Sequence, residues 1–429
     1  MSDHEISNSS TEHRRLKRRL SADEKLLLDR IKLAGENGDR LPSEALEFEP
    51  SNPKIEEQNP SAPMSEMRPG AGCHRFAKLS FRTLCWLYLL IVSVLILGMH
   101  YSGQGNVMLA ALMYAPPLIW LPPGLVLLPP VLFFDWKSGL CLLASIMAFF
   151  VWHPDFQTGT TTALAKVKAP DTVRVLSWNR GQGKKASLSA LKADLHLDLI
   201  LLQEAKLSNY VHNPDYAEFQ DIQSMNDVVI LSRTPILEMT PIYSTGSKLA
   251  PQDGAPWGMR CVVFIAGQRC VIYNLHLPTP RDALESYMRG ACIWGVLGLV
   301  PYEPWERKRQ VHESFWKPYL DFSLSLQKQL LAESDPVLLA GDFNTPPMGP
   351  IHSQLTKGLQ DSHIAAGSGF GFTFPGDTHN PLSLFQPWLR LDRIHFSKHW
   401  QALHCSTFDM PAQHLPVIAE LQLLPSSHK

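Results

Sequence analysis

Two polar side chains follow a short apolar run in the second half of the chain. The run covers residues 337–341, and Asp342 and Asn344 come directly after it, before two prolines. An extended chain points side chains two positions apart to the same side, so a carboxylate and an amide would face one spot where a buried strand ends. Such a pair suits a phosphate group and a hard metal ion. The alternative is a local turn in which Asp342 only ends the strand.

Other apolar runs in the chain lead to a polar residue in the same way. Three of them are residues 172–179 ending at Asn179, residues 198–204 ending at Glu204, and residues 270–277 carrying His276. Taken singly, a strand-end carboxylate is more often solvated, and a strand histidine is more often packed, than either is a ligand. The series indicates a site because each run delivers a polar group of the same chemical kind.

Two further candidates lie near the end of the chain. Asp392 stands in the middle of an apolar run, residues 389–397, that predicts a strand. A carboxylate inside an apolar strand costs free energy unless it is paired, so Asp392 needs a partner. His414 stands in a turn that precedes the final predicted strand, within residues 413–421.

The elements that must position these residues alternate irregularly between strands and helices. Helical spacing is found over residues 188–197 and 306–333, a further strand is predicted at 227–236, and residues 261–265 and 270–277 form a predicted hairpin. A hairpin among alternating strands and helices favours a mixed α/β domain over a purely parallel sheet. We assign this domain to residues 170–429.

The first part of the chain has a different composition. Residues 1–78 are polar, with a basic run at 13–19 and a stretch rich in Pro, Glu and Ser at 42–70. Few apolar groups are present to offset the entropy of ordering, so a mostly disordered tail is expected. A secretory signal peptide is excluded, because the apolar run that should follow the basic residues closely comes about sixty residues later.

Residues 79–154 are predicted to be a transmembrane region of about three helices. Residues 83–99 are uncharged and apolar, and residues 107–152 form a second apolar tract interrupted only by Asp135 and Lys137. One crossing needs about 20 apolar residues, so the second tract has room for two crossings with a turn at 135–137. The alternative is two spans, with the proline pairs of the second tract forming a re-entrant or interfacial segment.

The charges beside the first span predict the sidedness of an integral membrane protein. Arg75, Lys78, Arg82 and the basic run at 13–19 all precede the span. Lys and Arg are enriched on the cytoplasmic side, so the N-terminus is expected in the cytoplasm. Three crossings then place the domain from residue 155 onward on the extracytoplasmic side.

Cysteine usage and charge exclude some classes of protein. The chain has 7 Cys and no C-x-x-C pair, which argues against a zinc knuckle and against a thioredoxin-type redox motif. Residues 170–429 contain 22 Lys and Arg against 24 Asp and Glu. A domain that grips long nucleic acid usually carries an excess of basic residues, and this domain is nearly neutral.

Six short motifs in order resemble those of the endonuclease/exonuclease/phosphatase superfamily. They are S-W-N at 177–179, L-L-Q-E at 201–204, N-L-H-L-P at 274–278, G-D-F-N at 341–344, L-D-R-I at 391–394 and Q-H-L-P-V at 413–417. The resemblance implies an α/β fold of two packed β-sheets flanked by helices, a four-layer α-β-β-α sandwich. It also implies hydrolysis of phosphoesters with Mg²⁺ or Mn²⁺ as cofactor.

The resemblance also implies a role for each matched residue. Glu204 would be the principal metal ligand with Asn179 beside it, and His276 would contact the phosphate. Asp342 would orient or activate the attacking water, and Asn344 would help to hold that water and a phosphate oxygen.

Asp392 and His414 would form an Asp–His pair in which the carboxylate fixes the imidazole tautomer and supports its charged form. One position departs from the superfamily pattern. An Asp usually precedes this histidine and commonly assists metal binding, but this chain has Gln413. A Gln can ligate only through its neutral carbonyl oxygen. The sequence therefore indicates a membrane-anchored Mg²⁺-dependent phosphodiesterase or nuclease-like hydrolase, with a catalytically impaired binding or scaffold module as the alternative.

The substrate class stays open at this point between nucleic acid and a phospholipid headgroup. Residues 291–300 are ten uncharged residues that follow the His276 strand, too few to span a bilayer. They are expected either to cover the domain as a lid or to dip into the membrane surface beside the phosphate site.

Overall fold

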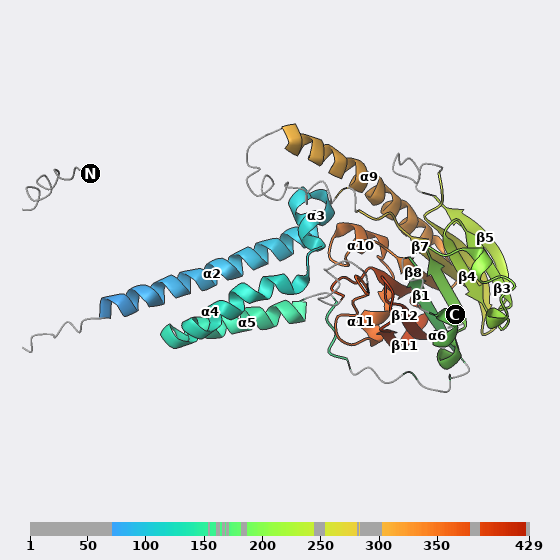
Figure 1. Cartoon of the computed structure of the whole chain (residues 1–429), viewed down its shortest axis with the longest axis horizontal. Helices are drawn as coiled ribbons and strands as arrows, with labels where there is room; N and C mark the ends of the chain where they lie inside the picture. Colours follow the sequence, from blue (N-terminus) through green and yellow to red (C-terminus); the bar gives the residue numbers. More distant parts are fainter. Residues whose placement is uncertain are drawn as a thin grey trace, which may run out of the picture. The chain divides into compact units, whose positions relative to one another are not determined.

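The computed structural model describes most of the α/β domain and the apolar helices before it (Figure 1). The described residues are 71–152, 155–159, 164, 168, 171–181, 187–243, 254–280, 283, 303–377 and 387–425. The predicted tail up to residue 70 and the apolar segment 291–300 lie outside these residues. The lid and membrane-contact alternatives for 291–300 therefore stay predictions.

Within the described residues, twelve strands form two six-stranded sheets that pack face to face. The first sheet has the order β11-β12-β1-β2-β4-β3, with β1 at Thr172–Asn179, β2 at Leu199–Gln203, β3 at Asp221–Met225, β4 at Val228–Ser232, β11 at Trp400–Thr407 and β12 at Val417–Leu423. The second sheet has the order β5-β6-β7-β8-β10-β9, with β5 at Ile236–Ile242, β6 at Gly258–Ile265, β7 at Gln268–His276, β8 at Val337–Asp342, β9 at Gln360–Asp361 and β10 at Asp392–Phe396.

A single apolar core fills the space between the sheets. Val175 and Ile230 from the first sheet and Ile272, Ala340 and Ile394 from the second are all fully buried in it. These residues lie on the inward faces of their strands because side chains alternate across a strand. Burial of both inner faces joins the sheets into one sandwich.

Helices cover the outer faces of both sheets, so the predicted four-layer fold class is confirmed. The elements are α6 at Leu188–Leu195, η4 at Leu207–Asn209, η5 at Pro214–Tyr216, α9 at Glu303–Ala332, α10 at Pro350–Leu355 and α11 at Ser362–Ala366. Helix α9 packs Tyr319, Phe322 and Leu326 against the second sheet, and α6 packs Leu188 against the first. Both helices use the apolar stripe that their sequence periodicity predicts.

Strand register brings the predicted site residues to one end of the sandwich. Strand β8 lies between β7, which is parallel to it, and β10, which is antiparallel. Asp342 is the register partner of His276 on one side and of Asp392 on the other. Asn179 pairs with Gln203 at the ends of the parallel strands β1 and β2, directly before Glu204.

Several predicted elements have different bounds in the structure. The strand predicted at 227–236 is β4, which ends at Ser232, and a separate strand β5 begins at Ile236. Asp392 is the first residue of β10 and not the middle of a strand, because residues 389–391 run outside the ladder. The sequence analysis did not predict β3, β9 or β11, which are short or only partly buried and lack a continuous apolar run.

Among the described residues, four α-helices and two short 3-10 helices precede the sandwich. They are α2 at Ala71–Tyr101, η2 at Gly103–Gly105, α3 at Val107–Met113, η3 at Pro117–Trp120, α4 at Leu121–Phe134 and α5 at Trp136–Trp152. Helix α2 begins at Ala71, inside the range 1–78 that was predicted to be the tail. Helices α2, α4 and α5 share a small apolar core that includes Cys85, Val131 and Leu142.

Among the described residues, one helix is long and apolar enough to cross a membrane, and it spans Arg75–Tyr101. Helices α4 and α5 have 14 and 17 residues, about 21 Å and about 26 Å at the usual rise per residue. Asp135 lies between them, as the predicted turn requires. The number of spans stays a prediction.

The second apolar tract does not begin as a span. Helix α3 opens it, but this helix follows η2, and η2 lies against the sandwich. An added Cβ on Gly103 would meet Pro350 at 2.9 Å, and one on Gly349 would meet Gln104 and Met113 at 2.7 Å. Residues 103–113 therefore contact the α/β domain, and the arrangement of spans within 107–152 stays a prediction.

Candidate active site

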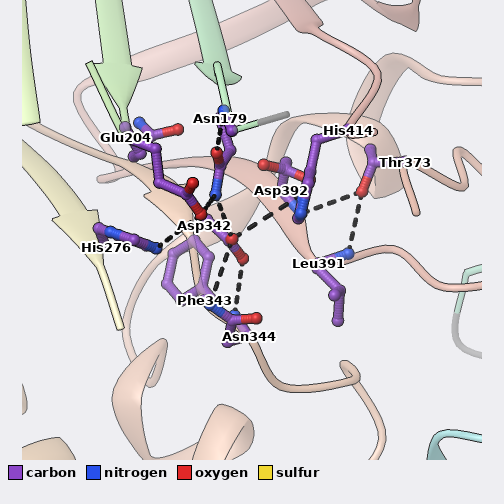
Figure 2. Close-up of polar contacts among 12 residues, drawn as sticks. Asn179, Glu204, His276, Asp342, Phe343, Asn344, Thr373, Leu391, Asp392 and His414 are labelled. Carbon is purple, nitrogen blue, oxygen red and sulfur yellow. Dashed lines mark hydrogen bonds and ion pairs between the residues drawn. The ribbon is translucent and has the colours of Figure 1, made fainter. Parts of the chain in front are cut away.

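Asp342 is the centre of the candidate site (Figure 2). Its Oδ2 accepts hydrogen bonds from Nδ2 of Asn179 at 2.9 Å and from Nδ2 of Asn344 at 3.2 Å. Its Oδ1 accepts the backbone N–H of Asn344 at 2.9 Å. Asp342 therefore forms the local turn that the sequence analysis gave as an alternative, and the carboxylate of Asp342 also faces the site.

The backbone around Asp342 requires glycine before it. Gly341 has φ +140°, and an added Cβ would lie 1.9 Å from the carbonyl oxygen of Leu275. Only glycine allows this close approach of β7 and β8. The approach sets Asp342 beside the end of β7, where His276 stands.

Asn344 has both amide hydrogens committed to the protein. Its Nδ2 donates to the carbonyl of Leu277 at 2.8 Å and to Asp342. Both neighbours are acceptors, which fixes the amide orientation. Oδ1 is therefore the side-chain atom left to act on a water molecule, as an acceptor. Asn344 adopts φ +46°, so its side chain reaches Asp342 through a tight turn and not through strand alternation.

His276 is held by a carboxylate that the sequence analysis did not select. Its Nδ1 lies 2.6 Å from Oδ2 of Asp227, and its Nε2 lies 3.9 Å from Oε1 of Glu204. Burial lowers the pKa of His276, but the hydrogen bond to Asp227 and the charges of Asp342 and Glu204 outweigh it, and the pKa is raised. Asp227 was counted only as the start of a strand, and its position before β4 gave no signal of its role.

His414 and Asp392 form the predicted pair. Nδ1 of His414 lies 2.8 Å from Oδ2 of Asp392 and 3.9 Å from Oδ2 of Asp342. Burial lowers the pKa of His414, but the two carboxylates outweigh it and raise the pKa to about 9. Burial raises the pKa of Asp392 in turn.

The surroundings of this pair fix the position of His414. The ring of Phe374 packs on the imidazole with 4.8 Å between ring centroids, and the carbonyl of His414 accepts the indole N–H of Trp178 at 2.9 Å. Thr373 accepts the backbone N–H of Asp392 at 3.2 Å. Sequence analysis missed Thr373, which lies between Phe372 and Phe374 outside the named strands.

Three side-chain oxygens converge beside Gly181. A Cβ added there would lie 3.2 Å from Oδ1 of Asn179, 3.2 Å from Oε2 of Glu204 and 3.4 Å from Oε1 of Gln413. Glycine leaves this space open, and the side chain of Glu204 is 47% exposed toward it. Carboxylate and amide oxygens are the ligands of hard divalent ions, so these residues fit such an ion.

Two other groups of described residues bring three His or Asp ligand atoms within 4.8 Å. The first is Asp342, Asp392 and His414, in which Nδ1 of the histidine is already bonded to Asp392. The second is His352, Asp361 and His395, in which Nδ1 of His352 accepts from Arg393 at 2.9 Å. Positive charge and occupied nitrogens make both groups poorer cation sites than the oxygens beside Gly181.

All seven predicted site residues lie together at this end of the sandwich (Figure 2). They are Asn179, Glu204, His276, Asp342, Asn344, Asp392 and His414. The individual catalytic roles that the sequence assigned to them stay predictions.

The chain is similar to several solved structures at low sequence identity. An endonuclease/exonuclease/phosphatase family protein from Leptotrichia buccalis is 17% identical, with 58% of this chain and 100% of that chain covered and a TM-score of 0.38. A mannosyl-6-phosphatase from Bacteroides thetaiotaomicron is 15% identical, with 58% and 99% covered and a TM-score of 0.40. Caenorhabditis elegans TDP2, as a truncated protein, is 18% identical, with 58% and 98% covered and a TM-score of 0.38. No curated protein sequence matches the chain significantly.

The family comparison covers the whole sandwich. The model of the Endonuclease/Exonuclease/phosphatase family matches residues 176–428. This range contains β1 from Leu176 onward, every later strand and all seven site residues. The chain therefore belongs to the endonuclease/exonuclease/phosphatase family, whose enzymes hydrolyse phosphoester bonds, typically with a divalent metal ion.

Proposed function

We propose that the protein is a membrane-anchored phosphodiesterase that uses Mg²⁺ or Mn²⁺ and in-line attack by water. The observation that carries this proposal is the convergence of Asp342 with two histidines, His276 and His414, each bonded to a second carboxylate. The raised pKa of both histidines favours their charged form. Two charged imidazoles and a carboxylate on one spot suit a phosphate and its attacking water.

The role of each residue follows from the side-chain atoms that its hydrogen bonds within the protein leave available. Asp342 and Oδ1 of Asn344 accept hydrogen bonds from the attacking water and orient it. His276 donates to a phosphate oxygen through Nε2, because its Nδ1 is taken by Asp227. His414 holds or moves a proton at Nε2, with Nδ1 fixed by Asp392. A divalent ion held by Glu204, Asn179 and Gln413 would neutralise charge on the phosphate.

The surface of the leading helix supports membrane anchoring. Along α2, the side chains of Trp86, Leu90 and Val94 are 57%, 59% and 58% exposed. Large exposed apolar patches on a helix of this length are typical of lipid-facing surfaces. Lys78 and Asp135 lie 3.5 Å apart near one end of the helix group, where charged side chains can reach a membrane interface.

Hydrolysis by the full chain in detergent tests the activity. With Mg²⁺ or Mn²⁺ the protein should cleave bis(p-nitrophenyl) phosphate, and Glu204→Ala or His414→Ala should each lower kcat by roughly 10²-fold or more. The control is Glu306→Ala, which removes an exposed carboxylate on α9. Activity that survives excess EDTA and both site substitutions would overturn the proposal.

A second candidate function is a non-catalytic binding or scaffold module. Gln413 favours it, because a neutral amide stands where the third oxygen points at the space beside Gly181. Titration of the full chain with Mn²⁺ by calorimetry separates the two candidates. Binding by the wild type supports the enzyme, whereas binding that appears only in Gln413→Asp supports the scaffold.

The net charge of the domain bears on which class of substrate it binds. The near-neutral charge of residues 170–429 gives no bulk attraction for long nucleic acid. We therefore favour a phospholipid headgroup over DNA or RNA. Parallel assays of the full chain on plasmid DNA, RNA and phospholipid vesicles decide between them.

The predicted side of the membrane has its own test. Three crossings would place the catalytic domain on the extracytoplasmic side. Alkaline phosphatase fused after residue 152 should then be active in a bacterial host, since this reporter works only outside the cytoplasm. An inactive fusion with normal expression would reject the three-span arrangement.

A further inference from the structure

The segment between α2 and α4 reaches the catalytic domain although it lies outside the family match at 176–428. The carbonyl of Gln104 accepts Nε2–H of His312 from α9 at 2.6 Å, and Gln104 is 1% exposed. The indole N–H of Trp388 donates to the carbonyl of Tyr114 at 3.3 Å. Residues 103–114 are thus bonded to the sandwich at both ends.

Tyr114 contacts the loop that carries the catalytic candidates. Its hydroxyl donates to the backbone carbonyl of Asn344 at 2.7 Å. Its ring packs against the apolar cluster under α9, which includes Phe343 and Tyr319. A residue 230 positions away in sequence therefore touches the backbone of a site residue.

Three successive carbonyls of this loop are each held by a side chain. Tyr319 from α9 donates to the carbonyl of Phe343, Tyr114 donates to that of Asn344, and Arg393 from β10 donates to that of Thr345. The outer two donors belong to the family domain. The middle donor comes from the segment that links the apolar helices.

The loop needs such support because its conformation is unfavourable. Asn344 has φ +46°, in the left-handed region that costs an ordinary residue free energy. Residues in this region keep their conformation only when their surroundings fix it. The hydroxyl of Tyr114 fixes the peptide that follows Asn344 and so helps to set where the Asn344 side chain lies.

We propose that Tyr114 is a positioning residue of the active site, and that through it the apolar helices α2, α4 and α5 help to set the geometry of the Asp342–Asn344 loop. The inference rests on phosphoester hydrolysis at this site, and it does not depend on which substrate is used. Movement or repacking of these helices would change catalysis through the bond from Tyr114 to Asn344. The family domain alone would carry all seven site residues and lack this donor.

Kinetics of Tyr114→Phe in the full chain in detergent are the first test. Loss of one hydrogen bond to the loop should lower kcat about 2- to 10-fold, with KM changed less than 2-fold, since the loop orients water and His276 contacts the phosphate. The matched control is Tyr88→Phe, because the Tyr88 hydroxyl also donates to a backbone carbonyl, that of Trp120, at 2.9 Å within the helices. The control should keep kcat within 2-fold of wild type.

A double-mutant cycle separates positioning from general destabilisation. If Tyr114 acts through Asn344, Tyr114→Phe should have less than a 2-fold effect on kcat in the Asn344→Ala background. Effects that multiply independently in the two backgrounds would overturn the proposal. An unchanged kcat in Tyr114→Phe, in a protein whose activity is lost with Glu204→Ala, would also overturn it and leave the proposed function standing.

Hydrogen exchange gives a readout that needs no catalysis. The backbone N–H groups of Phe343 and Asn344 are bonded to the carbonyl of Leu391 at 3.0 Å and to Asp342 at 2.9 Å. Tyr114→Phe should speed exchange at both by several-fold, and Tyr88→Phe should leave both unchanged. Unchanged exchange in Tyr114→Phe would overturn the inference even if wild-type hydrolysis were not found.

Discussion

Two buried clusters of histidine and aspartate among the described residues have opposite electrostatics. In the cluster at the candidate active site, His414 lies between the carboxylates of Asp392 and Asp342. In the second cluster, near β9 and β10, His352 and His395 lie with Asp361 among arginines. Both clusters combine histidine and aspartate beside β10: Asp342 and Asp392 lie on β8 and β10, and Asp361 and His395 on β9 and β10, whereas His414 comes from a loop and His352 from α10. Their different neighbours give them different chemistry.

The pKa values follow the charges around each cluster. The carboxylates raise the pKa of His414 to about 9. Burial lowers the pKa of His395 to about 4, and Arg393 and Arg390 add to that effect. Burial and Arg393 likewise hold the pKa of His352 well below its ordinary value. A histidine beside an aspartate is therefore no sufficient sign of a catalytic pair, because the next shell of charges decides its protonation.

Substitution of Asp392 should produce the largest difference between the clusters. Asp392→Asn removes the charge that supports protonated His414 and should lower kcat by roughly 10²- to 10⁴-fold. The matched change in the second cluster is His352→Gln, which keeps an acceptor for Arg393. It should keep kcat within about 2-fold. Steady-state hydrolysis of bis(p-nitrophenyl) phosphate measures both, and equal losses would show that the clusters are not functionally distinct.

Removal of one arginine should show that the second cluster is structural. Nε of Arg390 lies 2.6 Å from Asp155, and its Nη1 lies 2.7 Å from Asp361. Arg390→Met leaves two buried carboxylates without this partner and should lower the free energy of unfolding by about 3–5 kcal/mol. Denaturant titration followed by tryptophan fluorescence measures the change.

The control for this prediction is another arginine with two carboxylate partners. Arg309 is paired with Glu306 and Glu313 on the exposed face of α9. Arg309→Met should leave the free energy of unfolding nearly unchanged, because exposed ion pairs contribute little. A similar loss in both variants would mean that burial of the Arg390 pairs does not matter.

The two clusters should give opposite pH dependences of stability. His414 has a folded pKa of about 9 against an ordinary value of 6.5, so the folded state binds an extra proton between these values and stability falls as pH rises through them. His395 has a folded pKa of about 4, so the unfolded state binds the extra proton below 6.5 and stability falls as pH drops toward 4. Across each of these two pH ranges, which we call the alkaline limb and the acid limb, the free energy of unfolding should change by about 3 kcal/mol.

Single substitutions should remove one limb at a time. With EDTA present, His414→Gln should flatten the free energy of unfolding above pH 6.5 and leave the acid limb, and His395→Asn should do the reverse. Denaturant titrations at pH 5, 6.5 and 8.5 measure both limbs. A wild-type profile without a maximum near pH 6.5 would contradict the opposite charge environments.

Most of the site residues could be located from the sequence because they stand at or near the end of an apolar run, whereas Asp392 stands inside one. Asp342 and Glu204 needed only the position of a strand end, and the resemblance supplied their order. Their partners could not be found in this way. Asp227 meets His276 only through the arrangement of β4 and β7 in different sheets, 49 positions apart in sequence.

The fold class was predictable for the same reason, and its irregular parts were not. Inner-face positions such as Val175 and Ile272 are apolar, so the strands of a mixed α/β domain are visible in the sequence, whereas the two-sheet sandwich was implied by the family resemblance. Strand β3 carries a polar sequence and is only half-buried, so it has no hydrophobic signal. The contact of Tyr114 with Asn344 depends on how two segments dock, which no local pattern encodes.

The buried ion pair between Asp155 and Arg390 has a consequence for how the enzyme meets its substrate. Asp155 follows α5 closely in sequence, and its partner Arg390 lies just before β10, the strand that begins with Asp392. This ion pair, which lies just after the last apolar helix, restricts the rotation of the domain that a flexible linker would allow. If the helices are fixed in a bilayer, the active site keeps one orientation relative to the membrane. The direction from which a substrate approaches then affects binding as well as the affinity of the site.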